Sequence, residues 1–292
     1  MKHIFLSFVL LLVVTAATAQ SLPPYRNTPL PIETRVEDLL GRMTLDEKID
    51  QLSHIHSDNV MEDGRIDTLR FSRLMGPATR GFIEAFTLSG RDCRTFMTAA
   101  LERSRRSRLG IPVFTTTEAL HGSVQDGSTI FPQSVALGST FNPTLVGEMA
   151  TAVALELRAQ GINQILSPVL DVCRDLRWGR VEECFSEDPY LNTRLASAEV
   201  KAYRAAGISP MLKHFGPHGE PVGGLNLASV QCGPRDVLSV FLRPFETVVR
   251  EGDALAVMSS YNSWNHEPNS SSHWMMTELL RDTWGFKGYV YS

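Results

Sequence analysis

The sequence predicts an α/β fold, a parallel (β/α)8 barrel of the TIM type that is incomplete at its C-terminus. Three observations favour this fold. Helices and short apolar strands alternate from Thr34 onward, several helices end at a glycine directly before a strand, and the strands are apolar without alternation. Strands buried on both faces are typical of a parallel sheet. The phosphate-binding patterns GxGxxG and GxxxxGK[ST] do not occur in the sequence, which weakens a nucleotide-binding alternative.

Capping signals mark where the predicted helices begin. Thr44 to Glu47 form a capping box, which opens a short helix with Ile49 and Leu52 on its inner face. Proline follows an N-capping residue at two later helix starts. The other predicted helices run from Asn142 to Gly161, from Asp188 to Gly207, from about Pro234 to Gly252 and from about Ser271 to Gly285.

Polar residues follow the predicted strands at their carboxyl ends. The strands run from Ile111 to Thr117, Ile162 to Leu166, Ile208 to Leu212, Ala254 to Met258 and Gly288 to Tyr291. The polar residues after them are Glu118, His121, Asp171, Lys213, His214, Ser259, Tyr261 and Asn262. Active sites of parallel barrels lie at this rim. A carboxylate or a lysine can bond two vicinal hydroxyls, so the rim suits a polyhydroxylated ligand.

The N-terminus has the pattern of a secretory signal. Lys2 and His3 precede an apolar stretch, and Ala17 to Ala19 form a small-x-small cleavage site. The apolar stretch is too short to span a membrane. We therefore expect a signal peptide over 1–19, an extended leader over 20–33 and the barrel over 34–292, in a secreted or periplasmic protein.

Charge and cysteine spacing exclude some classes of partner. The net charge of −4 gives no reason to expect nucleic acid or an anionic membrane. The basic run Glu102–Arg108 is interpreted as the solvated end of a helix. The four cysteines do not have the spacing of a metal site. Cys173 and Cys184 bracket a loop and can form a bridge, with buried free thiols as the alternative. No metal or organic cofactor is expected.

Six motifs, in order, carry a resemblance to a known family. They include Glu118–Gly122, Ser167–Val172 with Arg174–Arg180, Ser186–Tyr190, Lys213–Phe215, Met258–Asn262 and Trp284–Gly288. Together they resemble the N-terminal barrel domain of glycoside hydrolase family 3, over Arg35 to Ser292. The resemblance implies a retaining hydrolase, in which one carboxylate attacks the anomeric carbon and a second group acts as acid and base.

The resemblance also implies roles for individual residues. Glu118, Arg180, Lys213 and His214 match the residues that bind sugar hydroxyls, and Asp171, His218 and Tyr261 are secondary candidates. The nucleophilic aspartate of the family would follow Ser292, so no catalytic residue is assigned within the chain. The acid/base is usually supplied by a following domain, which we expect as the missing partner. Leu225 stands where many members carry an arginine.

These observations predict an exo-acting retaining hydrolase that releases terminal β-D-glucosyl or xylosyl residues from oligosaccharides. Without a nucleophile, the chain by itself is expected to be inactive. A non-catalytic carbohydrate-binding or interaction protein derived from this fold is the alternative. An N-acetylglucosaminidase is disfavoured, because no Asp-Ser/Thr-His sequence follows the Lys213-His214 loop that ends near His218.

Overall fold

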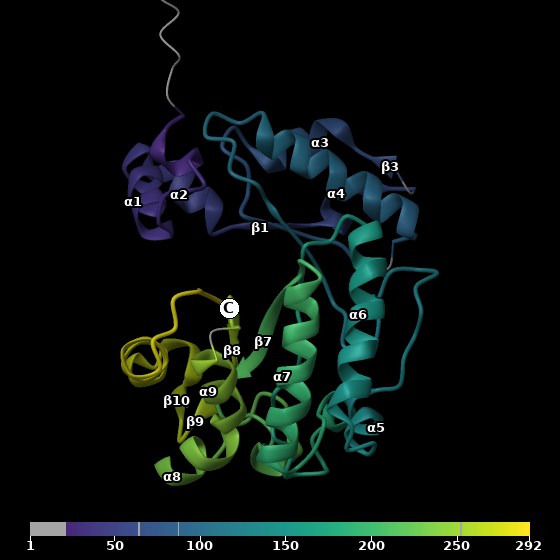
Figure 1. The fold of residues 1–292 in the computed structure, drawn as a ribbon, viewed down its shortest axis with the longest axis vertical. Helices are drawn as coiled ribbons and strands as arrows, with labels where there is room; N and C mark the ends of the chain where they lie inside the picture. Colours follow the sequence, from purple (N-terminus) through teal and green to yellow (C-terminus); the bar gives the residue numbers. More distant parts are fainter. Residues whose placement is uncertain (1–21, 64, 87, 252) are drawn as a thin grey trace, which may run out of the picture. The chain divides into compact units, whose positions relative to one another are not determined.

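The computed structural model describes residues 22–63, 65–86, 88–251 and 253–292 (Figure 1). The predicted signal peptide lies outside these residues. The chain divides into two compact units at Lys48, and each is considered by itself. In the first unit, the 3-10 helix η1 (Pro24–Arg26) precedes α1 (Ile32–Arg42). The main-chain N–H of Tyr25 donates to the Asp38 carboxylate over 3.1 Å.

Two predictions near the N-terminus differ from the structure. The leader predicted as extended over 20–33 contains η1, and α1 begins inside it. The capping box of Thr44 and Glu47 is confirmed, with reciprocal hydrogen bonds of 2.9 and 3.2 Å before α2 (Leu45–Gln51). The prediction that Ile49 and Leu52 face inward is wrong, since they are 52% and 85% exposed. The helix ends at Gln51, so Leu52 no longer continues its face.

A seven-stranded parallel sheet forms the centre of the second unit, and its strands stand in chain order. The strands are β1 (His54–His56), β4 (Phe82–Glu84), β5 (Phe114–Thr117), β6 (Gln164–Ile165), β7 (Ser209–Phe215), β8 (Ala256–Ser259) and β11 (Tyr289–Tyr291). Each strand pairs in parallel with its neighbour. The predicted strands after residue 110 are confirmed, while β1 and β4 were not predicted. The predicted barrel-type α/β fold is confirmed.

The sheet curls, so that strands distant in sheet order approach one another on its inner side. The ring of Tyr289 on β11 lies 5.5 Å from that of Phe82 and 5.4 Å from that of Phe114. The hydroxyl of Tyr291 donates to Glu84 on β4 over 3.0 Å. β1 and β11 stand at the two ends of the strand order among the described residues. The sheet therefore has the curvature of an incomplete barrel.

Helices follow the strands. They are α3 (Thr68–Met75), α4 (Gly90–Arg105), α5 (Ser134–Gly138), α6 (Pro143–Ala159), α7 (Pro189–Ala205), α8 (Pro234–Asp236) and α9 (Arg243–Arg250), with π-helices η5 (Val237–Phe241) and η7 (Trp274–Thr283). α6 and α7 pack side by side, and α7 also contacts α9 (Figure 1). The predicted caps are confirmed: Asn142 accepts from Leu145 N–H at 3.1 Å and Asp188 from Tyr190 N–H at 2.8 Å.

Short strands and 3-10 turns lie in the loops between the main elements. Two antiparallel ribbons pair β2 (Met61–Glu62) with β3 (Arg65–Ile66) and β9 (Ser263–Trp264) with β10 (Glu267–Pro268). The 3-10 turns are η2 (Ser57–Asn59), η3 (Val181–Glu183), η4 (Val222–Gly224) and η6 (Asn269–Ser271). Both η3 and η4 lie in loops at the carboxyl ends of central strands, where the predicted rim residues are found.

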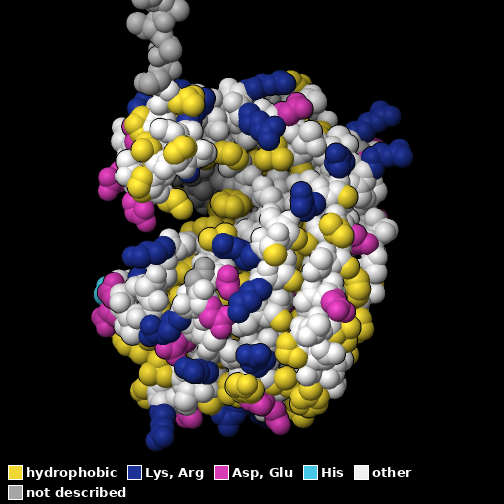
Figure 2. Space-filling view, in the orientation of Figure 1, with side chains coloured by type: hydrophobic (Ala, Val, Ile, Leu, Met, Phe, Trp, Pro, Cys, Tyr) yellow, Lys and Arg dark blue, Asp and Glu magenta, His cyan; other side chains and the backbone are white. Residues whose placement is uncertain are grey.

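Charged side chains of both signs lie on the face of the molecule shown in Figure 2. On the face in Figure 2, Lys and Arg side chains are interspersed with Asp and Glu. The basic run predicted as a helix end begins in the last turn of α4, as predicted. No described helix combines the length and apolar character needed to cross a membrane.

Candidate functional site

A lysine and a glutamate pair at the ends of two central strands. Lys213 lies in β7, and Glu118 follows β5 directly. The Lys213 ammonium donates to both carboxylate oxygens of Glu118, at 2.7 and 2.9 Å. The lysine side chain is 2% exposed and that of the glutamate 28%. Burial raises the pKa of Glu118, while Lys213 opposes that shift. The pair offers charged hydrogen-bonding groups at the rim, with the glutamate partly open to solvent.

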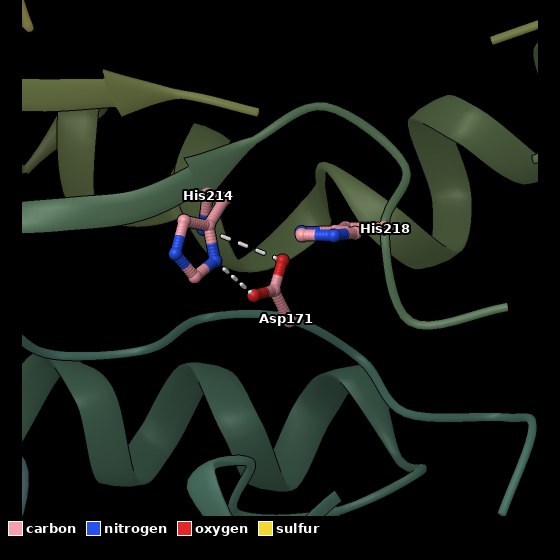
Figure 3. Close-up of side chains that lie close together, drawn as sticks. All are labelled: Asp171, His214 and His218. Atoms are coloured by element: carbon pink, nitrogen blue, oxygen red, sulfur yellow. Dashed lines mark hydrogen bonds and ion pairs between the residues drawn. The ribbon is translucent and has the colours of Figure 1, made fainter. Parts of the chain in front are cut away.

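A second buried pair joins the same strand to the loop after β6. The Asp171 carboxylate accepts from His214 Nδ1 at 2.7 Å and from the main-chain N–H of His214 at 3.3 Å (Figure 3). Burial raises the pKa of Asp171 and holds that of His214 well below its usual range. With the Asp171 carboxylate as the acceptor of this bond, the proton of the neutral ring is assigned to Nδ1. Nε2 points away from Asp171 and is left as an acceptor (Figure 3).

His218 extends this group without completing its own hydrogen bonds. Its Nε2 donates to the carbonyl of Asn226 at 3.2 Å, and Nδ1 has no hydrogen-bond partner among the described residues. The His218 ring packs 4.7 Å from Trp178, 5.1 Å from His214 and 5.4 Å from Tyr261. This placement fits the predicted secondary role better than a role as general acid, since burial lowers the pKa of His218.

Three loops are tied together around Arg180. The guanidinium of Arg180 donates to the two oxygens of Glu183 at 2.8 and 2.7 Å and to the hydroxyl of Tyr261 at 2.9 Å. The amide of Asn226 accepts from the Trp178 indole N–H at 2.9 Å and donates to the same Tyr261 hydroxyl at 2.7 Å. The loops after β6, β7 and β8 are thereby joined at the rim.

The structure brings the predicted site residues together. Arg180 interacts electrostatically with Asp171, Glu118 and His214. The Tyr261 ring lies 6.2 Å from that of His214. His121, another strand-end residue, instead bonds through Nδ1 to the carbonyl of Phe131 at 3.0 Å. The four principal candidates and the three secondary ones therefore form one group, and His121 is engaged by its own loop.

Some members of the group were not predicted. Glu183 and Asn226 hold Arg180 and Tyr261, and Glu84 meets Tyr291 at the inner side of the sheet. Glu183 stands three residues after Arg180, at a spacing that suits an ion pair within a turn, and this signal was available in the sequence. Asn226 gave no such signal, because its partners come from two other loops.

The buried cluster of Asp171, His214 and His218 has the residue types of a metal site. Ligand atoms of Asp171, His214 and His218 lie within 4.8 Å of one another. In the hydrogen bond between His214 and Asp171, Nδ1 carries a proton and therefore has no lone pair for a cation. The same bond occupies one lone pair of the Asp171 carboxylate. A neutral histidine oriented by a carboxylate is suited to accept a hydrogen bond from a ligand hydroxyl.

Comparison with known proteins identifies the family. Residues 44–292 match the glycosyl hydrolase family 3 N terminal domain. The chain belongs to glycosyl hydrolase family 3. It is 32% identical to a putative β-xylosidase of Formosa agariphila over 92% of the chain, and 33% identical to a periplasmic β-glucosidase of Salmonella typhimurium over 96%.

A solved structure of a similar protein supports the fold. A β-glucosidase from Erythrobacter marinus superposes with a TM-score of 0.84 at 33% identity, covering 93% of this chain and 37% of that one. The chain likewise spans 37% and 36% of the length of the two curated relatives. The resemblance stated from the motifs is thus confirmed at the level of family and fold.

Proposed function

We propose that this family 3 chain forms the sugar-binding part of an exo-acting, retaining β-glycosidase that releases terminal glucosyl or xylosyl residues. The arrangement that carries the proposal is the adjacency of two pairs, Lys213 with Glu118 and Asp171 with His214. They offer a cationic donor, a carboxylate acceptor and a neutral imidazole acceptor at one rim. Vicinal hydroxyls of a pyranose both donate and accept, so they match this set.

The two carboxylates serve as binding groups in this proposal and not as the nucleophile. Asp171 is 2% exposed and is occupied by two hydrogen bonds from His214. Glu118 is held at both oxygens by Lys213. A nucleophile must be ionised and free to approach the anomeric carbon. The resemblance assigns that role to neither residue, so we propose that Glu118 and Asp171 bind the sugar and do not attack it.

The names of the relatives support the class of substrate. One relative is called a β-glucosidase and the other a putative β-xylosidase, so both sugars are included. The periplasmic location of the Salmonella relative agrees with the proposed signal peptide over 1–19 and with a secreted or periplasmic protein. We also propose a barrel domain over 34–292 and a further domain that supplies the acid/base group.

Binding of glucose and xylose tests the proposed sugar site. Isothermal titration of the 292-residue chain is expected to detect at least one of the two sugars, and Lys213→Met is expected to weaken that binding at least tenfold. Lys201→Met is the matched control, because Lys201 pairs with Glu251 at the surface. Equal affinities in all three proteins would contradict the proposed site.

Hydrolysis separates the enzyme from the alternative of a non-catalytic binding protein. The purified gene product is expected to cleave nitrophenyl β-glucoside or β-xyloside. A gene product that binds sugar but leaves every nitrophenyl glycoside intact would favour the binding protein.

A further inference from the structure

Two buried cysteines bracket the loop that carries Trp178 and Arg180. Cys173 and Cys184 stand at its two ends and are 4% and 1% exposed. They belong to one small hydrophobic cluster with Val169 and Trp178. Each thiol acts on the pKa of the other, so the two side chains lie within interaction distance. Two thiols of one buried cluster need only a small movement of their side chains to form a disulfide bond.

The reduced thiols form only weak hydrogen bonds, and these would be broken when a disulfide forms. Cys173 Sγ donates to the carbonyl of Asp175 over 3.7 Å, and Cys184 Sγ donates to the carbonyl of Arg180 over 3.6 Å. Both carbonyls belong to the enclosed loop. Such long sulfur hydrogen bonds are weak, so their loss does not oppose a covalent link.

The two thiols differ in reactivity. The neighbouring Cys184 thiol lowers the pKa of Cys173, and Cys173 together with burial raises that of Cys184 well above its usual range. Burial raises the pKa of Cys93 to about 12 and that of Cys232 to about 11. Cys173 is thus the cysteine with most thiolate character, and the thiolate is the nucleophile in disulfide exchange.

We propose that Cys173 and Cys184 form a redox-active pair that closes to an intramolecular disulfide by exchange with a small disulfide such as oxidised glutathione. Cys173 thiolate attacks one sulfur of the oxidant and releases one thiolate. Cys184 then loses its proton and attacks the sulfur of Cys173, which releases the second thiolate. Two electrons pass from the cysteines to the oxidant, and the two cysteine protons end on the two released thiols.

The disulfide constrains the loop that presents Arg180. Ten residues, 174–183, lie between the two cysteines, and they include Trp178 and Arg180. Closing a loop of this size restricts the unfolded chain and the open forms of the loop. The formation of the bond does not depend on the proposed glycosidase function, so its test is independent of any activity.

Peptide mapping tests the bond directly. The 292-residue chain is incubated in buffers of increasing oxidised-to-reduced glutathione ratio, both as the folded protein and during refolding from urea. Acid quenching, alkylation with N-ethylmaleimide and proteolysis precede mass spectrometry. The expected product is one linked peptide pair that joins Cys173 to Cys184, while Cys93 and Cys232 are alkylated. Refolding exposes every thiol to the oxidant, so burial cannot conceal a competent pair.

Variants sharpen this result. The Cys93→Ser, Cys232→Ser double variant is expected to keep the link, and Cys173→Ser is expected to lose it. Oxidation is expected to raise the Tm of the wild-type chain by about 5 °C, reversibly with a reducing agent, and to leave that of Cys173→Ser unchanged. Alkylation of both Cys173 and Cys184 at the highest oxidant ratio, in folded and refolded protein alike, would overturn the proposal. A link from either residue to Cys93 or Cys232 in the soluble monomer would also overturn it.

Discussion

The buried carboxylate of Asp171 orients the ring of His214 and is not exposed to solvent. It accepts both the ring and the main-chain N–H of His214, and burial disfavours charge on both residues. This arrangement fixes the ring orientation and leaves Nε2 unprotonated. A histidine oriented in this way does not need to reorganise when a hydroxyl donates to it.

Replacing Asp171 by asparagine is expected to weaken sugar binding about tenfold to a hundredfold. An amide has one acceptor oxygen, so it cannot receive both N–H groups of His214, and hydrogen bonds to charged groups contribute about 1.5–3 kcal/mol. Titration with whichever of glucose or xylose the wild-type chain binds measures the effect. Asp126→Asn is the control, because Asp126 is exposed. Unchanged affinity in a folded D171N protein would contradict the positioning role.

Glu199 on α7 is a buried carboxyl group without an evident function. Its Oε1 has no hydrogen-bond partner in the described residues, and burial raises its pKa to about 8. The hydroxyl of Tyr203, one turn further on, is also buried without a described partner. In the folded protein Glu199 holds a proton that the unfolded chain releases above its usual pKa of about 4.3.

Stability is therefore expected to fall as pH rises between about 4.5 and 8. A proton held only by the folded state contributes up to about 1.4 kcal/mol for each pH unit in this window. Urea unfolding at pH 5 and pH 8 measures the loss. The Glu199→Gln variant is expected to show a smaller loss than the wild type, while the exposed-site control Glu187→Gln retains the wild-type loss. Equal slopes for all three proteins would show that Glu199 is ionised in the folded state.

At the scale of elements, one side chain joins three loops. Asn226 accepts from Trp178 and donates to Tyr261, and the same Tyr261 hydroxyl accepts from Arg180. Side chains that share partners in this way are coupled, so the loss of one loosens the others. Arg180 therefore depends on a residue 46 positions later in the chain.

Asn226→Ala is expected to make the loop around Trp178 more open to proteases. Arg177 in this loop is 71% exposed at its side chain and is a site for trypsin. Cleavage after Arg177 is expected to become several times faster in the variant, because Trp178 loses its hydrogen bond to Asn226. Gln231→Ala is the control, since Gln231 contacts only His266 in the bonds described for its side chain. An identical cleavage rate would mean that the loop is held by its own packing.

The strand-end site residues could be predicted because the sequence encodes them locally. Lys213 and Glu118 each stand next to an apolar run, and parallel strands bring such positions to one rim. The capping box at Thr44 was also predictable, since both partners lie within four residues. Local patterns of this kind do not depend on the rest of the fold.

Other features could not be predicted, because they depend on distant contacts. β1 contains two histidines around Ile55, and β4 has three residues, so neither shows an apolar run long enough to indicate a strand. Asn226 acquires its partners only when three loops meet. Leu52 was assigned to an inner face by helical periodicity, but the helix ends before it. Pairing across the sheet supplies the information that the local sequence lacks.

At the scale of the whole sheet, aromatic side chains hold the curl of the second unit. Phe82 stacks on Phe114 at 5.3 Å and meets Tyr289 and Tyr291 from β11, each at 5.5 Å. These contacts join β4 and β5 to a strand several positions away in the sheet order. Aromatic pairs contribute about 0.5–1.5 kcal/mol beyond their buried area.

Phe82→Ala is expected to destabilise the chain by about 3 kcal/mol, since truncation removes the contacts with all three rings. Urea unfolding measures the change. Phe141→Ala is the control, because Phe141 is 73% exposed. A loss as small as that of the control would show that hydrogen bonding along the strands, and not the aromatic cluster, maintains the curl.

The agreement between strand order and chain order has a consequence for biosynthesis. Each strand of this sheet lies beside the sheet strand that precedes it in the chain, and the ribbons β2–β3 and β9–β10 stand apart from it. A nascent chain can therefore add each unit to a surface that has already left the ribosome, without waiting for a distant segment. Each new strand pairs with the sheet strand that precedes it, so the sequence separation between paired strands is kept small. A small separation favours rapid assembly from the amino-terminal side. The growing border of the sheet remains exposed until its next neighbour is translated.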